Sequence, residues 1–186
     1  MKLVVATSNL HKLREIAEIL SDFEVVSERE AGFLSEVEET GETFLENAIL
    51  KARTVCMATG LPALGDDSGL CVDALGGAPG VYSARYSGGG DAENRALLLK
   101  NLQGIDNRGA HFSCAVALAF PDGRLLTAEG RTYGTILHEA RGNGGFGYDP
   151  LFLSDDLGVS FAEASEAQKN AVSHRGRALE RLKGQL

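Results

Sequence analysis

The run from His111 to Phe120 places the strongest constraint on how this chain can fold. Large and small side chains alternate along it: the large ones are Phe112, Val116, Leu118 and Phe120, and the small ones are Ser113, Ala115, Ala117 and Ala119. A period of two predicts a β-strand, and two apolar faces predict a central strand with another element packed closely on the small face. Residues 121–123, Pro-Asp-Gly, predict a turn. We expect residues 125–134 to return as an antiparallel strand.

The N-terminal segment predicts a strand, a polar turn and a helix in that order. Residues 3–6 are continuously apolar, which is typical of a strand buried on both faces. Apolar residues recur at helical spacing over residues 10–20, with Ser8 or Asn9 as the natural N-cap. Such a helix start directs backbone N–H groups and a positive dipole end at one place, which favours an anion. Lys12 lies in the first helical turn, where either a bound phosphate or simple solvation accounts for it.

Two adjacent carboxylates, Asp66 and Asp67, stand between glycines in residues 65–69. The apolar run 61–64 predicts a short strand, so we expect the acids at or near its end, with a further strand over residues 70–72. A carboxylate pair in that position could hold a hard cation through oxygen ligands. The same residue types form tight turns, and on these five residues alone the turn is the slightly favoured interpretation.

The remaining pattern predicts an α/β fold. The further elements expected are a strand over 23–27, a long helix opened by a capping box at Thr43, a helix from an Asp91 N-cap to Leu102, a short strand over 151–153, a capping box at Ser165 and a last helix through Leu182. No internal repeat or linker interrupts this order. We therefore expect one domain over residues 1–186, with a mixed, strongly twisted central sheet flanked by helices.

Charge and cysteine content limit the possible partners and location. A net charge of −8 argues against a general nucleic-acid binder, although it leaves room for a local basic pocket that takes a small anion. No apolar run reaches the ~18 residues of a membrane span, and no long apolar segment marks a signal peptide. Cys56, Cys71 and Cys114 are widely spaced in apolar surroundings. We expect them to be reduced core residues of a cytoplasmic protein.

Seven motifs, in order along nearly the whole chain, resemble those of the inosine triphosphate pyrophosphatase (HAM1-like) family, which removes non-canonical purine nucleoside triphosphates. They are residues 7–12, 38–41 with Phe44, 46–48 with 51–52, 66–69, 76–80, 145–150, and Lys169 with 173–175. One departure is Ser8, where the family usually has glycine. Serine keeps the backbone N–H groups, so we expect little effect unless that position requires a positive φ.

The resemblance implies a fold of two lobes around a nucleotide cleft, usually in a homodimer. It also implies Mg²⁺-dependent hydrolysis of ITP, dITP or XTP to the monophosphate and pyrophosphate, in preference to ATP and GTP, which cleanses the nucleotide pool. Glu38 and Asp67 would hold the Mg²⁺ ion, with Asp66 as a possible support. Asp67 would also orient or deprotonate the attacking water.

Basic residues from three segments are expected at the phosphates. Lys12, with the backbone of residues 7–9, would hold them, and Lys51 and Lys169 would flank them. Taken alone, Lys169 is typical of an exposed helix lysine, so its role rests on the resemblance.

A second group of residues is expected to contact the nucleoside. Arg175 and backbone N–H groups near His174 would donate to the O6 atom of hypoxanthine, where adenine presents a donor instead. Phe146 suits stacking on the base, and Asp149 suits a polar contact with base or sugar. The predicted substrate-binding residues are Thr7, Ser8, Asn9, Lys12, Lys51, Ser68, Phe146, Gly147, Tyr148, Asp149, Lys169, His174 and Arg175.

Three alternatives to this function remain. A pyrophosphatase similar to the septum-related Maf family would act on pyrimidine triphosphates, and residues 146–149 and 173–175 argue against it. A nucleotide-binding module without turnover has little use for so complete a set of site residues: Glu38, Asp67, Lys12 and Lys51. A scaffold without a ligand would leave the basic residues beside the acids unexplained.

Overall fold

The computed structural model describes residues 1–186, which divide by packing into two compact units. Unit 1 comprises residues 1–67, 114–130 and 175–186, and unit 2 comprises residues 68–113 and 131–174. Three strands contribute residues to both units: β3 (Ala63–Val72), β4 (Gly109–Ala119) and β5 (Leu125–Ile136). The assignment of the whole chain to one domain stays a prediction.

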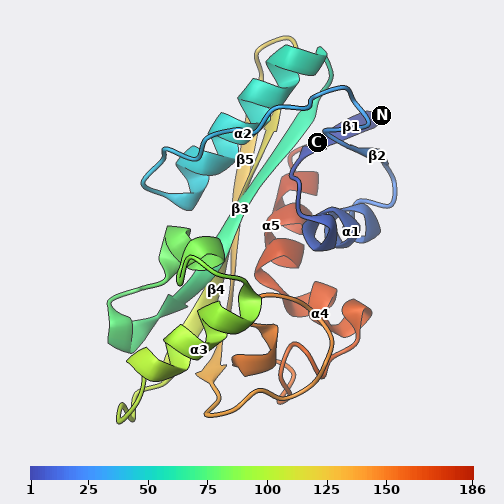
Figure 1. The fold of residues 1–186 in the computed structure, drawn as a ribbon. Helices are drawn as coiled ribbons and strands as arrows, with labels where there is room; N and C mark the ends of the chain where they lie inside the picture. Colours follow the sequence, from blue (N-terminus) through green and yellow to red (C-terminus); the bar gives the residue numbers. More distant parts are fainter. The chain divides into compact units, whose positions relative to one another are not determined.

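The strands form a six-stranded mixed sheet in the order β2-β1-β3-β4-β5-β6 (Figure 1). β1 (Lys2–Ala6) pairs in parallel with both β2 (Glu24–Ser27) and β3, and β6 (Phe152–Ser154) pairs antiparallel with β5. Phe120 N donates to Arg124 O across the predicted turn between β4 and β5. The predicted α/β class with a mixed sheet flanked by helices is confirmed.

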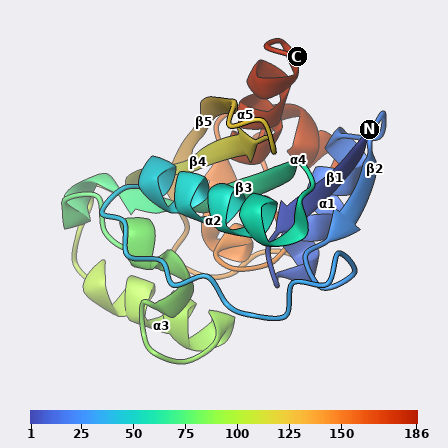
Figure 2. The ribbon, with the colours of Figure 1, turned by 90° about the horizontal axis from the view of Figure 1, so that it is seen from above.

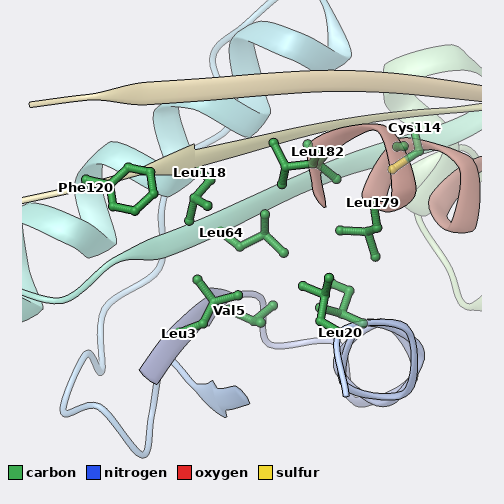
Figure 3. Close-up of a cluster of buried hydrophobic side chains, with 12 residues drawn as sticks. Leu3, Val5, Leu20, Leu64, Cys114, Leu118, Phe120, Leu179 and Leu182 are labelled. Carbon is green, nitrogen blue, oxygen red and sulfur yellow. The ribbon is translucent and has the colours of Figure 1, made fainter. Parts of the chain in front are cut away.

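In unit 1, β1 divides two apolar cores between its faces. Leu3 and Val5 pack on the side of α1 (Leu10–Ile19) and α5 (His174–Lys183), as Figure 3 shows with Leu20, Leu179 and Leu182. Val4 and Ala6 pack on the side of α2 (Phe44–Thr59). The alternation follows from the strand period of two.

The small face of β4 is covered as predicted. Val116 and Leu118 lie in the core with α1 and α5, whereas Ala115, Ala117 and Ala119 lie in the core with α2. Figure 2 shows α2 running along the sheet beside β3. Alanines on this face let the helix approach closely, which explains why the sequence alternates large and small residues here.

The predicted strand end and turn at residues 65–69 are wrong, because the whole segment lies inside the ten-residue strand β3. Gly65 serves close packing instead of a turn: a Cβ atom there would lie 2.1 Å from Ala48 O and 2.8 Å from Ala52 N of α2. Glycine, aspartate and serine favour turns locally, but the contact with α2 determines the backbone here. Asp66 and Asp67 therefore lie on a strand, not in a flexible loop.

Unit 2 has its own aromatic core. Phe112 of β4 contacts Phe152 of β6 at a ring-centroid distance of 4.6 Å and Phe161 at 5.9 Å. The helices of this unit are α3 (Asp91–Asn101) and α4 (Glu166–Val172), with 3₁₀ turns η1 (Asp73–Leu75), η2 (Gly80–Arg85) and η3 (Asp149–Leu151). The N-cap of α3 is Gly90, one residue before the predicted Asp91, and Asp91 accepts a hydrogen bond from Gly147 N at 2.9 Å.

The other helix starts match the sequence closely. Asn9 caps α1, and Ser165 forms the predicted capping box of α4. Thr43 caps α2 by accepting from Glu46 N, but the Glu46 carboxylate accepts from Glu42 N instead of closing the box. No helix in the structure has both the length and the apolar character needed to cross a membrane.

Candidate active site

The pairing of β1 with β3 brings the predicted phosphate loop of unit 1 beside the two acids. Ala6 pairs with Gly65, so β1 ends where β3 continues into Asp66 and Asp67. The loop that follows β1 is ordered by its own side chains, since Asn9 N donates to Thr7 Oγ1 and Asn9 Oδ1 accepts from Lys12 N. Every residue with a positive φ is a glycine, so Ser8 is unstrained and the small effect expected of this departure is supported.

Asp66 and Asp67 point to opposite faces of the sheet, because they are neighbours on one strand. Leu64, two residues before Asp66, packs in the core with α1 and α5. Gly65, two residues before Asp67, faces α2. The two carboxylates therefore belong to separate clusters, and they are not a pair of ligands for one ion.

Asp66 is the counter-ion of two cations. Its Oδ1 accepts from Lys12 Nζ at 2.8 Å, and its Oδ2 accepts from Arg175 Nε at 2.8 Å and from Cys114 Sγ at 3.1 Å. Arg175 Nη1 also donates to Glu15. Burial would raise the pKa of Asp66, but Arg175 and Lys12 outweigh it and hold this pKa well below the usual value. Asp66 thus fixes the predicted phosphate ligand Lys12, whose charge also acts on Asp67.

Asp67 is buried in a less compensated setting. Its Oδ2 accepts from Asn47 Nδ2 at 3.0 Å, and its Oδ1 lies 3.7 Å from Lys51 Nζ. Lys51 also donates to Glu39 Oε1 at 3.0 Å. Burial raises the pKa of Asp67, and the nearby charge of Lys51 only partly opposes this effect. A raised pKa makes the carboxylate a better base, and it means that a further cation would stabilise the charged form.

The oxygen donors of unit 1 suit a magnesium ion. Glu38 is exposed, whereas Glu39 is half-buried at Lys51. No group of three or more histidine, cysteine, aspartate or glutamate side chains is arranged to hold a metal. Mg²⁺ commonly uses one or two protein carboxylates and takes its other ligands from water and phosphate, so Asp67 with one glutamate of this loop fits. The assignment of Glu38 as that glutamate stays a prediction.

A polar pocket of unit 1 collects several predicted residues. Its volume is about 260 Å³, and its lining includes Thr7, Ser8, Lys51, Glu28, Glu36 and Glu39. Glu28 is half-buried, and this burial raises the pKa of its carboxyl group. Thr7 and Ser8 of the phosphate loop therefore share one cavity with Lys51, which is far away in the sequence.

In unit 2, Phe146, Asp149 and Lys169 also lie together. Lys169 Nζ donates to Asp149 Oδ2 at 2.7 Å, and both side chains are buried. Asp149 Oδ2 accepts from Phe146 N at 3.0 Å, and Lys169 Nζ lies 4.7 Å from the centroid of the Phe146 ring. Lys169 is thus a buried, paired lysine instead of the exposed one that the sequence alone suggests. The contacts of all three with substrate stay predictions.

Hydrogen bonds from both sides tie down the loop residues Gly147 and Tyr148. Gly147 has a φ of 59° and its carbonyl accepts from Arg95 Nη1 at 2.7 Å. Tyr148 is buried and donates to Ser83 O at 2.7 Å, and burial raises the pKa of its hydroxyl. The backbone of this loop is therefore held in place by unit 2 itself.

His174 and Ser68 are the remaining predicted residues. The His174 ring stacks on Phe112 with a centroid distance of 4.8 Å and an interplanar angle of 13°. Ser68 lies half-buried within β3, not in a turn. Their proposed contacts with substrate remain untested by these positions.

Comparison with known proteins identifies the family. The model of the Ham1 family matches residues 3–185. The chain belongs to the Ham1 family. It is 53% identical to a dITP/XTP pyrophosphatase of Geobacter sulfurreducens, over 100% of this chain and 96% of that protein. It is 52% identical to a dITP/XTP pyrophosphatase of Desulforamulus reducens, over 97% and 93% of the two chains.

Solved structures agree with the Ham1 assignment. The Staphylococcus aureus Ham1 protein superposes with a TM-score of 0.89 at 38% identity, covering 99% of this chain and 97% of that one. A HAM1 protein from Coxiella burnetii gives 0.88 at 43% identity, with the same coverage. The family predicted from seven short motifs is confirmed.

Sequence reasoning assigned no individual role to three residues of this Ham1-family site: Glu15, Glu39 and Asn47. Glu15 is a second partner of Arg175, and the two are separated by 160 residues with no pattern that links them. For Asn47 a signal was present, because it stands four residues before Lys51 and shares a helix face with it.

Proposed function

We propose that this Ham1-family chain hydrolyses non-canonical purine nucleoside triphosphates, namely dITP, XTP and ITP, to the monophosphate and pyrophosphate. The relatives named dITP/XTP pyrophosphatase, at 53% and 52% identity over almost the full length, support this choice of substrate. The observation that carries the proposal is Asp67. It is a buried carboxylate with a raised pKa, held by Asn47 and Lys51.

Asp67 is proposed as the general base. A water molecule attacks the α-phosphorus, the bond from this phosphorus to the oxygen of the leaving pyrophosphate breaks, and Asp67 takes the proton of the water at a carboxylate oxygen. An aspartate has an ordinary pKa near 4 and is a weak base. Burial raises the pKa of Asp67, but a cation held by the same carboxylate would lower this pKa again, so acidification of the attacking water must contribute to the step. Lys12 and Lys51 supply positive charge against the charge that develops on pyrophosphate.

Asp67 and Glu38, or its neighbour Glu39, are proposed to hold Mg²⁺. When bound, the ion supplies positive charge that neutralises phosphate oxygens and acidifies water. Asp66 holds the Lys12 ammonium group through a 2.8 Å hydrogen bond, so this lysine is already ordered before a nucleotide arrives. Ordering before binding lowers the entropic cost of association.

The choice of base is proposed to depend on hydrogen-bond donors at purine position 6, as the sequence predicts for Arg175 and the backbone near His174. Arg175 is fully buried, and Asp66 and Glu15 fix its guanidinium group. Leaving a buried donor opposite the adenine amino group could discriminate against ATP by about 10⁴-fold.

A panel of triphosphates tests the function. Purified protein with Mg²⁺ is expected to release pyrophosphate, and not orthophosphate, fastest from dITP, XTP or ITP. Asp67→Asn serves as the negative control and is expected to lose turnover while staying folded. Faster turnover of dTTP or UTP would favour the pyrimidine alternative, and tight binding without turnover would favour the binding module.

We also propose a cytoplasmic homodimer. Three free cysteines, two of them buried, suit a reducing compartment. Light scattering coupled to size-exclusion chromatography measures the mass directly, and a monomer at micromolar concentration would refute the dimer.

A further inference from the structure

Asn47 joins three segments of unit 1 through one buried side chain. It lies on α2, one turn before Lys51, and is 1% exposed. Its Nδ2 donates to Asp67 Oδ2 at 3.0 Å, and its Oδ1 accepts from Gly41 N at 2.8 Å. The same Nδ2 lies 3.5 Å from Gly41 O. Because a buried amide without partners is costly, these bonds together fix the orientation of the side chain.

Gly41 is packed directly against this amide. A Cβ atom at position 41 would lie 2.6 Å from Asn47 Oδ1 and 2.7 Å from Glu46 Cβ. The glycine is therefore required by proximity, not by a positive φ, since Gly41 has none. The loop that carries Glu38 and Glu39 thus ends in a backbone contact with the residue that holds Asp67.

We propose that Asn47 is a positioning residue. Its amide nitrogen Nδ2 donates to the Asp67 carboxylate, and its amide oxygen Oδ1 accepts from Gly41 N and so holds the loop of residues 38–41. This inference rests on the proposed function, because it assigns Asn47 a role in the same reaction. Asn47 makes no contact with the reacting atoms in this role. It sets the direction of Asp67 Oδ1 by holding Oδ2, and it sets the distance from Asp67 to the glutamates of the loop.

The kinetic consequence is a selective loss of kcat. Misplacing a reacting group by about 1 Å can cost about 10²-fold in rate, so Asn47→Ala is expected to lower kcat about 100-fold. The KM for dITP should change less than about threefold, because the phosphate ligands Lys12 and Lys51 remain. In an Asp67→Asn background, Asn47→Ala should change any residual turnover little further, since residues that act as a unit are not additive.

Two variants that exchange an amide for a carboxylate distinguish the contact of Asn47 with Asp67 from its contact with Gly41. Asn47→Asp keeps an acceptor for Gly41 N but removes the donor to Asp67, so the loop should stay docked while kcat falls. The double variant Asn47→Asp/Asp67→Asn restores a donor and an acceptor in reversed order. It should regain the stability lost in Asn47→Asp but not the activity, because the carboxylate then stands on α2.

Asn94 provides a matched control for burial. It is 2% exposed and ties residues 83–87 to α3 through hydrogen bonds to Ser87 N and Ala84 O. Asn94→Ala should lose stability as Asn47→Ala does, but without the 100-fold loss of kcat. Equal losses of kcat in the two alanine variants would overturn the positioning role and leave a purely structural one.

Hydrogen exchange of the ligand-free protein gives a readout that does not need turnover. Asn47→Ala should make the amide of Gly41, which donates to Asn47 Oδ1, exchange at least tenfold faster, whereas Asn94→Ala and Asn47→Asp should not. Unchanged protection of the Gly41 amide in Asn47→Ala, or a kcat within threefold of wild type, would overturn the inference. If the wild type turns over no triphosphate, the proposed function fails, and the exchange experiment alone decides whether Asn47 holds the loop.

Discussion

Asp66→Asn and Asp67→Asn are the same chemical change at adjacent positions, and the structure predicts opposite effects on stability. Asp66 is ionised between Lys12 and Arg175, and its pKa is held well below the usual value although burial opposes this. The pKa of Asp67 is raised by burial. The charge of Asp66 therefore stabilises the fold, whereas the charge of Asp67 destabilises it.

The size of the stability loss in Asp66→Asn depends on which cation, Lys12 or Arg175, is left buried without a counter-charge. Lys12 is 16% exposed at its side chain and can regain water, but the Arg175 side chain is only 1% exposed. Removing one partner of a buried ion pair costs about 3–5 kcal/mol. We expect that loss for Asp66→Asn, which corresponds to a fall in Tm of roughly 6–20 °C for a chain of this size. For Asp67→Asn we expect a change between zero and a gain of about 1 kcal/mol.

Urea unfolding in the presence of EDTA, from pH 7 down to pH 3, measures both effects. A carboxyl group with a lowered folded pKa contributes stability that is present above its unfolded pKa near 4 and is lost as pH falls through the folded value. The loss in Asp66→Asn should therefore shrink in acid. A raised folded pKa reduces stability as pH rises from about 4 through the folded value, so any gain in Asp67→Asn should also vanish in acid.

Equal losses of stability in Asp66→Asn and Asp67→Asn at pH 7 would refute the prediction of opposite effects. Such a result would mean that the two carboxylates share one environment, which contradicts their positions on opposite faces of β3. A loss in Asp66→Asn that does not depend on pH would likewise show that its charge is not the cause.

Three further outcomes are expected. Gly65→Ala should destabilise the protein by about 3 kcal/mol or more in urea unfolding, because its Cβ meets Ala48 O at 2.1 Å; Gly184→Ala, whose nearest contact is 3.5 Å, should change stability by less than about 1 kcal/mol. Lys12→Ala should raise the Kd for a non-hydrolysable dITP analogue about tenfold or more in calorimetry. Unchanged affinity would show that Lys12 does not bind the phosphates. Removal of metal with EDTA should abolish pyrophosphate release and Mg²⁺ should restore it, whereas full activity in EDTA would exclude the proposed metal site.

The sequence predicted the elements whose own pattern is sufficient. The alternation over residues 111–120 identified a central strand and its close-packed small face, because side-chain size along a strand directly reflects what covers each face. Asn9, Thr43 and Ser165 mark helix starts through local hydrogen bonds, and the structure has them as caps.

Residues 65–69 show why local pattern fails elsewhere. Their composition favours a turn, but Gly65 is present because α2 packs against it, and a contact with a distant helix leaves no local mark. The partners of Asp66 stand 54 and 109 residues away. Such ion pairs form only when the tertiary structure brings the residues together. The sequence could therefore suggest Lys12 and Arg175 as site residues, but not that Asp66 is the carboxylate that holds them.

Because Asp66 and Asp67 lie on opposite faces of β3, they distinguish the correct pairing register of this strand from a shifted one. If β3 slipped by one residue against β1, every side chain would change sides. Asp66 would then face α2, away from Arg175, and Ala63 or Gly65 would take the place of Leu64 in the core. A chain with the shifted register would lose stability and would also misplace the proposed base Asp67. The ion pairs of Asp66 therefore help to specify the register of β3.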